Sequence, residues 1–562
     1  MTLRLSALVA FTVAVGGAAC GGGALRAGGD AGIDDAGVPT IDGAAPTDAP
    51  VDTTRPPPAM CVVALDDMVF GLSNSEYEHT IRDLLGINGA GALVGGESLA
   101  AGSWATTAPA IDLAREANFK AAADNVATQA LAGISALLPC DPAVTGEDAC
   151  ATMFIASFGG RAYRRPLTSP ESATLRGAFD VARAAGDFAH AAVAVVAQAL
   201  KSPSFYRKGL QTIGTRTVAL SPYELASRLS YFLYRSMPDQ PLFAAAAAGQ
   251  LNTEAQVAEQ ATRMLSDPKA RDGIGDFLTL LMGLDGLDAR ADASASAADA
   301  ALLRAMKDET LAFSSSVLLG GGGWKTLLTS NEAWVNEALA PIYGVPGITG
   351  PALRRVSLDP KVRGGLLTRA AFLTLNSPVD RTSPTRRGIG LLKTLLCLPE
   401  FPASPPAVPT DLMKRPGETT RAALAREVDV DPPCEACHAM TDSTGGAFEN
   451  FDQLGRARTV DENGLMLDTS GQFANGLGYP QGSFDGAVSM SAQLADAASV
   501  AQCSFTNWFR YAIPSNGNLN CRLMDRTWLP QQSFSDLVRL IVTSPEFLNV
   551  GVCLPSTCLQ PG

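Results

Sequence analysis

Helix-start signals followed by apolar residues at a helical spacing recur along the chain. At residues 73–76 the sequence Ser-Asn-Ser-Glu places a capping serine three residues before a glutamate, and apolar residues then recur on one helix face until Gly86, a natural helix stop. The same signal opens segments at residues 168–171 and 221–224. Alternating patterns typical of strands are rare. The pattern therefore predicts a mainly α protein made of several small helical domains in tandem.

One combination of local sequence features occurs twice in the chain. An apolar helical stretch ends in Ser-Pro-x-Phe at residues 202–205 and again at residues 544–547, and an aromatic-rich segment precedes each copy. Two interpretations remain open. The copies are either a diverged duplicate of one small helical unit or two uses of Ser-Pro as a common capping device.

The first residues have the features of an export signal. One positive charge at Arg4 precedes a short apolar stretch, residues 5–15, which is too short to span a bilayer. Small residues then lead into Cys20, as in a bacterial lipoprotein cleavage box, so we expect Cys20 to be lipidated. A glycine stands where such boxes usually have leucine, which leaves ordinary secretion with cleavage near Ala19 as the alternative. The next 40 or so residues are rich in Gly, Ala, Asp, Pro and Thr, and we expect a disordered tether.

Composition, charge and the absence of certain motifs exclude some classes of function. The 562-residue chain is 46% hydrophobic, which is enough for several cores. Its formal net charge is −13 and it has no long basic run, so we expect no nucleic-acid partner. No Gly-x-Ser-x-Gly elbow or His-Glu-x-x-His helix is present, and three histidines leave little material for a hydrolase, so we assign no catalytic residue.

The motif Cys434-Glu-Ala-Cys437-His438 carries the clearest chemistry. Two cysteines at this spacing can form thioethers with the two vinyl groups of one porphyrin, and the histidine that follows can coordinate the iron. We therefore expect covalent haem c, with His438 as the proximal iron ligand. A structural disulfide and another metal are the alternatives, although a thioredoxin-like pattern is not evident here and a zinc site would need two further ligands.

The remaining cysteines fit an oxidising compartment. Of 11 cysteines, assignment of Cys20 to a lipid and of Cys434 and Cys437 to haem leaves an even number, which allows four disulfides. Three pairs would close short loops, and the last two cysteines would form a long-range pair or remain buried thiols. These pairs are Cys140 with Cys150, Cys503 with Cys521, Cys553 with Cys558, and then Cys61 with Cys397.

The order of motifs resembles a family of large secreted proteins from planctomycetes and myxobacteria. These proteins consist of tandem domains of unknown function, numbered in the fifteen-eighties and fifteen-nineties, often with cytochrome c modules. The resemblance rests on residues 72–77 (Leu-Ser-Asn-Ser-Glu-Tyr), 161–168 (Arg-Ala-Tyr-Arg-Arg-Pro-Leu-Thr), 225–233 and 382–388, among others. It covers nearly everything after the tether.

This resemblance and the helical pattern together imply a domain order. We expect a lipoprotein-type signal peptide at 1–20, a disordered linker at 21–60, helical domains at 61–110, 111–212 and 217–345, a haem-like domain at 361–461, a C-terminal helical domain at 479–552 and a tail at 553–562.

The haem-like segment departs from the family pattern. In the family the histidine is followed by Asp-Pro-Leu-Gly and Glu-Asn-Phe-Asp; here Ser443 replaces the proline. Where the family usually has a histidine before the first cysteine, this chain has Glu427, so a ligand role there is lost. The acidic residues Asp442, Glu449 and Asp452 could act in acid or base catalysis, but we expect them to cap turns and hold the haem loop.

The second axial position of the iron has two candidate ligands. Met466 and Met490 lie downstream of His438 at separations where cytochromes c often supply a thioether, although either could be a core residue. An open sixth position, which would permit ligand or peroxide chemistry, is the alternative. We expect His79 and His190 to be buried and hydrogen-bonded.

Two functions from different classes follow. In the first, the chain is a c-type haem protein of the cell envelope, in the periplasm or outer membrane, anchored by a lipid and passing electrons to a redox protein or oxidative enzyme. In the second, it is a haem-free surface lipoprotein that acts as a scaffold or binding protein, with Cys434 and Cys437 in a disulfide.

Overall fold

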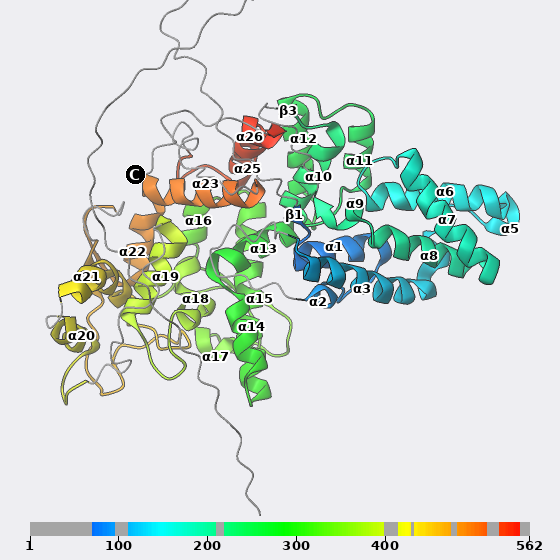
Figure 1. Cartoon of the computed structure of the whole chain (residues 1–562). Coiled ribbons are helices and arrows are strands. Elements are labelled where there is room, and N and C mark those ends of the chain that lie inside the picture. The colour runs from blue at the N-terminus through cyan, green and yellow to red at the C-terminus, as the bar shows by residue number, and fades with distance from the viewer. Residues whose placement is uncertain are drawn as a thin grey trace, which may run out of the picture. The chain divides into compact units, whose positions relative to one another are not determined.

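The computed structural model describes residues 70–95, 111–208, 218–397, 414–428, 432–473, 480–513 and 528–550. It confirms a mainly helical protein (Figure 1). Cys20, the export signal and the tether lie outside the described residues. None of the helices in the described ranges is long and apolar enough to cross a membrane.

The first group of helices has a hydrophobic core of its own. Phe119, Phe154 and Val196 are fully buried in it. Helices α6, α7 and α8 pack against one another, and α3 packs on α8 (Figure 1). The group consists of α1 (Asn74–Leu85), α2 (Gly91–Val94), α3 (Leu113–Ala130), the 3-10 helix η2 (Leu131–Gly133), α4 (Ile134–Leu137), α5 (Pro142–Thr145), α6 (Glu147–Ala162), α7 (Ser169–Ala185), α8 (Phe188–Leu200) and α9 (Pro203–Tyr206).

A second core extends from Leu220 to Phe547. The segments expected as the third, haem-like and C-terminal domains all contribute to it; for example, Trp508 stacks on Phe277 with ring centroids 3.5 Å apart. Its helices are α10 (Pro222–Leu233), α11 (Gln240–Ala247), α12 (Glu254–Leu265), α13 (Ala270–Met282), α14 (Asp285–Asp292), α15 (Ala297–Leu319), α16 (Trp324–Thr329), α17 (Ala340–Tyr343), η3 (Leu366–Thr368), α18 (Ala370–Leu375), α19 (Pro384–Leu396), α20 (Thr420–Val428), α21 (Pro432–Gly446), α22 (Gly486–Ala495), α23 (Ala498–Ala512), α25 (Phe534–Val542) and α26 (Pro545–Leu548).

The described strands are short and form four antiparallel pairs. The pairs are β1 (Phe70–Gly71) with β2 (Arg207–Lys208), β3 (Val218–Ala219) with β8 (Asn549–Val550), β4 (Glu332–Val335) with β5 (Arg354–Ser357), and β6 (Ser470–Gln472) with β7 (Ser483–Asp485).

The three helix-start signals are confirmed as capping boxes. Ser73, Thr168 and Ser221 are the N-caps of α1, α7 and α10, and in each box the side chain of the cap and that of the glutamate three residues later bond reciprocally to the backbone. Gly86 ends α1 in the left-handed conformation, with φ 73°. These helix ends were predictable because all the groups that form them lie within a few residues.

The two Ser-Pro-x-Phe segments adopt the same local arrangement. In each, an apolar helix leads to a capping serine, a one-turn helix and a two-residue strand, which pairs with the strand before a capping-box helix. An arginine guanidinium donates to the phenylalanine carbonyl in both: Arg164 to Phe205 at 2.9 Å and Arg228 to Phe547 at 2.6 Å. The shared one-turn helix and strand pairing support the interpretation as a duplicate, since a capping device alone does not require the strand; the two arginines come from different elements, the segment after α6 and helix α10.

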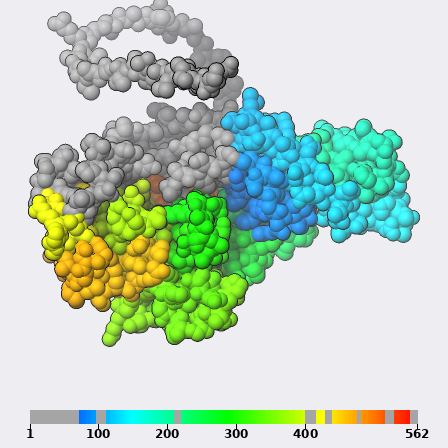
Figure 2. All heavy atoms as spheres, turned by 90° about the horizontal axis from the view of Figure 1, so that it is seen from below, coloured from blue at the N-terminus to red at the C-terminus, as the bar shows by residue number. Residues whose placement is uncertain are grey.

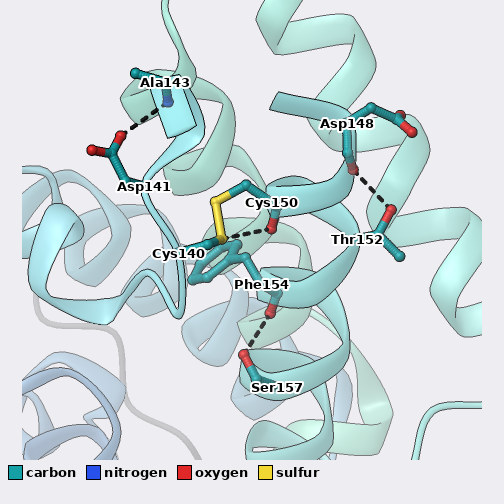
Figure 3. Close-up of a disulfide and its surroundings, with 8 residues drawn as sticks. All are labelled: Cys140, Asp141, Ala143, Asp148, Cys150, Thr152, Phe154 and Ser157. Atoms are coloured by element: carbon teal, nitrogen blue, oxygen red, sulfur yellow. Dashed lines mark hydrogen bonds between the residues drawn. A yellow bond between two sulfur atoms is a disulfide. The ribbon is translucent and has the colours of Figure 1, made fainter. Parts of the chain in front are cut away.

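The disulfide pattern is partly as predicted. Cys140 and Cys150 are joined, which ties the turn before α5 to α6 (Figure 3). The prediction for Cys397 and Cys503 was wrong: these two form a disulfide with each other, with Cα atoms 5.4 Å apart. Packing of α19 against α23 brings them together across 106 residues of sequence, which loop length alone could not reveal. The other expected disulfide cysteines lie outside the described residues.

Candidate functional site

The Cys-x-x-Cys-His motif lies on α21, which packs side by side with α19 (Figure 1). Two glycines permit this contact. A Cβ atom at Gly388 of α19 would overlap the backbone of Thr441, and one at Gly445 of α21 would overlap the backbone of Pro384. The close approach therefore requires glycine at both positions, and it sets the position of α21 relative to the core.

His438 is held by a carboxylate on the same helix. Its Nδ1 lies 2.7 Å from Oδ2 of Asp442, one helical turn later, and both side chains are about four-fifths buried, at 24% and 19% exposure. The other carboxylate oxygen of Asp442 accepts hydrogen bonds from the hydroxyls of Thr385, at 2.7 Å, and Thr441, at 3.1 Å. With a proton on Nδ1 directed to Asp442, Nε2 is the nitrogen that carries the coordinating lone pair.

The segment after α21 is held by Arg387 of α19. This fully buried guanidinium donates to the carbonyls of Phe448, at 2.8 Å, and Phe451, at 2.9 Å, and burial lowers its pKa to about 10. Glu449 forms an ion pair with Arg458 at 3.1 Å. Together these contacts fix the turn that follows the motif helix.

Asp452 also has a structural role. Its carboxylate accepts from the backbone N–H groups of Leu454 and Arg456, at 2.9 and 2.8 Å, and so caps a tight turn. Of the three carboxylates considered from the sequence, Asp442 contacts His438, whereas Glu449 and Asp452 stabilise the chain around it.

A cavity of about 360 Å³ opens beside His438. This volume is within the usual range of small-molecule sites, about 300–1,000 Å³. In Figure 2 the α20 and α21 region (yellow) lies at the surface beside the segment from residue 450 onward (orange). The cavity is lined by Pro384, residues 419–421, Leu424, Ala425, His438, Ala439, Asp442, Ser443, Gly446, Glu449, Asp461 and residues 466–468.

The other residues expected at the site are distributed differently. Cys434 and Cys437 are on α21 with His438. Met466 lines the cavity and is 73% exposed, whereas Met490 is fully buried in the core on α22 and is not among the lining residues. The prediction of a buried His190 was wrong, because its side chain is 61% exposed and lies 2.8 Å from Asp187 at the start of α8.

Two residues that line this cavity, His438 and Met466, are of types that ligate haem iron. An oriented imidazole and a thioether sulfur border the same space, and these are ligand types that c-type haems use. Sequence reasoning missed Thr385, which buttresses Asp442, and helix α20, which forms one wall. No local signal could have identified them, since both meet α21 only through the tertiary fold.

Three family models match consecutive parts of the chain. Residues 150–207 match PSD5, a protein of unknown function (DUF1595), residues 220–345 match PSD4 (DUF1592) and residues 363–461 match PSCyt3 (DUF1588). The His438 cavity falls within the last of these ranges. Comparison with curated proteins and with solved structures gave no match.

Proposed function

Since the chain belongs to the proteins built from tandem DUF1595, DUF1592 and DUF1588 domains, we propose that it is a c-type haem protein of the cell envelope that transfers electrons. One observation carries the proposal: His438, next to Cys-x-x-Cys on the same helix, borders a cavity with its Nδ1 held by Asp442. The name PSCyt3 of the matching family model agrees with a cytochrome-like role.

Each residue has a distinct part in this proposal. Cys434 and Cys437 would hold a haem through thioethers, and His438 would ligate its iron. Asp442 would accept the proton of Nδ1 and so direct the lone pair of the ring to Nε2, and the hydroxyls of Thr385 and Thr441 hold Asp442 in place. Met466, which also lines the cavity, would be a second protein ligand. A bound haem would supply one-electron redox chemistry.

We propose further that a lipid on Cys20 anchors the protein in the periplasm or outer membrane, with a redox protein or oxidative enzyme of the cell envelope as its partner. The small residues before Cys20 support the anchor, and the tether after it would give the folded part reach from the membrane. Disulfides such as Cys397 with Cys503 fit the oxidising side of a membrane.

The test is whether haem stays attached after denaturation. The chain with its own signal is expressed in a host that has a c-type maturation system, and the purified protein is unfolded and its intact mass measured. We expect the mass increment of one haem and an absorption spectrum of a c-type haem. The double variant Cys434→Ala/Cys437→Ala should lose the increment. As a matched control, Cys140→Ala/Cys150→Ala removes two cysteines far from the motif in sequence. This variant should retain the mass increment of the haem. A colourless wild-type protein of unmodified mass would instead favour a haem-free scaffold.

A further inference from the structure

A second and larger cavity lies away from the His438 site. Its volume is about 1120 Å³, above the usual upper limit of about 1,000 Å³ for sites of drug-sized ligands, so an extended ligand would fit it. Its walls come from the start of α1, from α13 and α15, and from the hairpin of β4 and β5. None of its lining residues is shared with the His438 cavity.

Most charges on the wall of this cavity are already neutralised by ion pairs. The pairs are Arg235 with Glu76 and Asp276, Arg82 with Asp272, Lys307 with Asp285 and Asp288, and Arg355 with Glu332. Paired charges of both signs do not select an ion, because a charged ligand would have to break an existing pair. Among the described residues, Arg271 is the exception to this pairing, and the rest of the wall favours a ligand without net charge.

Three hydroxyls on the wall lack the partner that helical hydroxyls usually have. Serine and threonine within helices often donate to the carbonyl four residues earlier, as Thr310 does to Met306 at 3.0 Å. Thr279 of α13 and the adjacent Ser315 and Ser316 of α15 have no hydrogen-bond partner for their hydroxyls within the described ranges. These groups are in position to bond to hydroxyls of a ligand.

An aromatic and aliphatic surface completes the lining. Trp334 of β4 borders the cavity and is partly exposed, and Leu280, Leu311 and Ala312 lie on the helices of the wall. A sugar ring presents hydroxyls at its edge and C–H groups on its faces, so it matches a wall of hydroxyl donors and acceptors combined with an indole.

We propose that this cavity binds a neutral oligosaccharide. Trp334 contacts the C–H face of a sugar ring, and Thr279, Ser315 and Ser316 bond to its hydroxyls. The size of the cavity calls for a chain of several rings. This proposal is independent of the haem at His438.

The test is isothermal titration calorimetry of the mature chain with four neutral tetrasaccharides (cellotetraose, xylotetraose, maltotetraose and mannotetraose) and with anionic trigalacturonic acid. We expect at least one neutral sugar to bind and to do so more tightly than the acid. Trp334→Ala should weaken binding at least tenfold, and Thr279→Ala several-fold. Thr329→Ala, which removes an exposed threonine hydroxyl from α16, is the matched control and should leave affinity unchanged.

A variant that fills the cavity separates loss of binding from loss of folding. Gly275 of α13 lines the cavity, and a Cβ atom there would only touch Leu311, so Gly275→Leu should fold and block binding. Gly177→Leu places the same side chain on α7, where nothing is near, and should not affect binding. Melting curves establish that all variants are folded. The proposal is overturned if no neutral sugar binds, if the acid binds best, or if Gly275→Leu and Trp334→Ala bind as wild type does.

Discussion

The imidazole Nδ1 of His438 lies 2.7 Å from Oδ2 of Asp442, and Asp442 in turn accepts hydrogen bonds from two threonine hydroxyls. A carboxylate that accepts the Nδ1 proton increases electron density on the ring and makes Nε2 a stronger donor to a metal. A stronger donor stabilises the oxidised iron. In a haem-loaded protein, this pair should therefore lower the reduction potential.

We accordingly predict that Asp442→Asn raises the reduction potential. Asparagine keeps a carbonyl that can accept from Nδ1 but removes the negative charge, so the imidazole becomes a weaker donor. The measurement is a spectroscopic redox titration of wild type and variant. Asp468→Asn is the matched control, because Asp468 lines the same cavity and its carboxylate bonds to Ser470 and pairs with Arg421. An equal shift in both variants would show a general effect of charge and contradict a specific role for Asp442.

We predict that Met466→Leu, and not Met490→Leu, removes the methionine-to-iron charge-transfer band of the oxidised protein. Leucine keeps volume and apolarity but lacks the sulfur. Met466 borders the cavity, whereas Met490 is fully buried in the core, where this exchange should cost less than about 1.5 kcal/mol of stability.

The absorption spectrum near the band and carbon monoxide binding to the reduced protein are the measurements for both methionine variants. Wild type should resist carbon monoxide and Met466→Leu should bind it, because the sixth position is then open. If wild type binds carbon monoxide readily and neither variant changes the spectrum, the haem has an open position and the electron-carrier proposal fails.

The two disulfides should differ in their contribution to stability. The Cys397 to Cys503 link closes a loop with a sequence separation of 106, against 10 for Cys140 to Cys150. In the chain-entropy model, losing the long-range link costs about 5 kcal/mol and losing the short one about 3 kcal/mol. Paired Cys→Ala variants compared by urea unfolding should show the larger loss for Cys397 and Cys503. The reverse order would contradict this assignment of the bonds.

Acid should weaken the cap of α7 at Glu171. Its hydrogen bond with Arg165, together with those from Thr168 and Ser204, lowers the pKa of Glu171 to about 2. Because the folded pKa lies below the ordinary value of 4.5, the contribution to stability is complete above pH 4.5 and is lost as the pH falls through 2. Glu171→Gln should cost about 1 kcal/mol at pH 7, and the difference from wild type should vanish near pH 2.

Glu224 provides the comparison for this prediction. It occupies the same capping-box position in α10, where it accepts from the N–H of Ser221 at 2.8 Å. Within the described chain it forms no ion pair with an arginine, so Glu224→Gln is the control that removes a capping glutamate without breaking such a pair. A pH-independent effect of Glu171→Gln would show that the cap is maintained without the charge.

If Cys20 is lipidated, replacing this residue should change the cell fraction in which the protein is found. Wild type should fractionate with membranes and have an acylated Cys20 at the mature N-terminus, because the acyl chains partition into the bilayer. Cys20→Ser should be found in the soluble fraction or retain its signal. Mass spectrometry of the N-terminal peptide decides between these states. A soluble wild-type protein that begins at another residue would establish ordinary secretion instead.

The features that the sequence determined by itself are those formed by residues close together in the chain. The capping boxes of α1, α7 and α10, the stop at Gly86 and the disulfide across the short loop from Cys140 to Cys150 all belong to this class. In each, the interacting groups are within about ten residues, so local geometry decides whether they meet. The Cys-x-x-Cys-His motif is likewise readable from its spacing alone.

Tertiary structure alone decided which distant residues meet. Cys397 pairs with Cys503 because α19 packs on α23, and Thr385 reaches Asp442 because two glycines let α19 and α21 approach closely. Met466 and Met490 look alike in sequence, yet only Met466 lies on the cavity with His438. The physical reason is the same in each case: these contacts depend on how helices pack, and packing depends on the shape of a core to which residues hundreds of positions apart contribute.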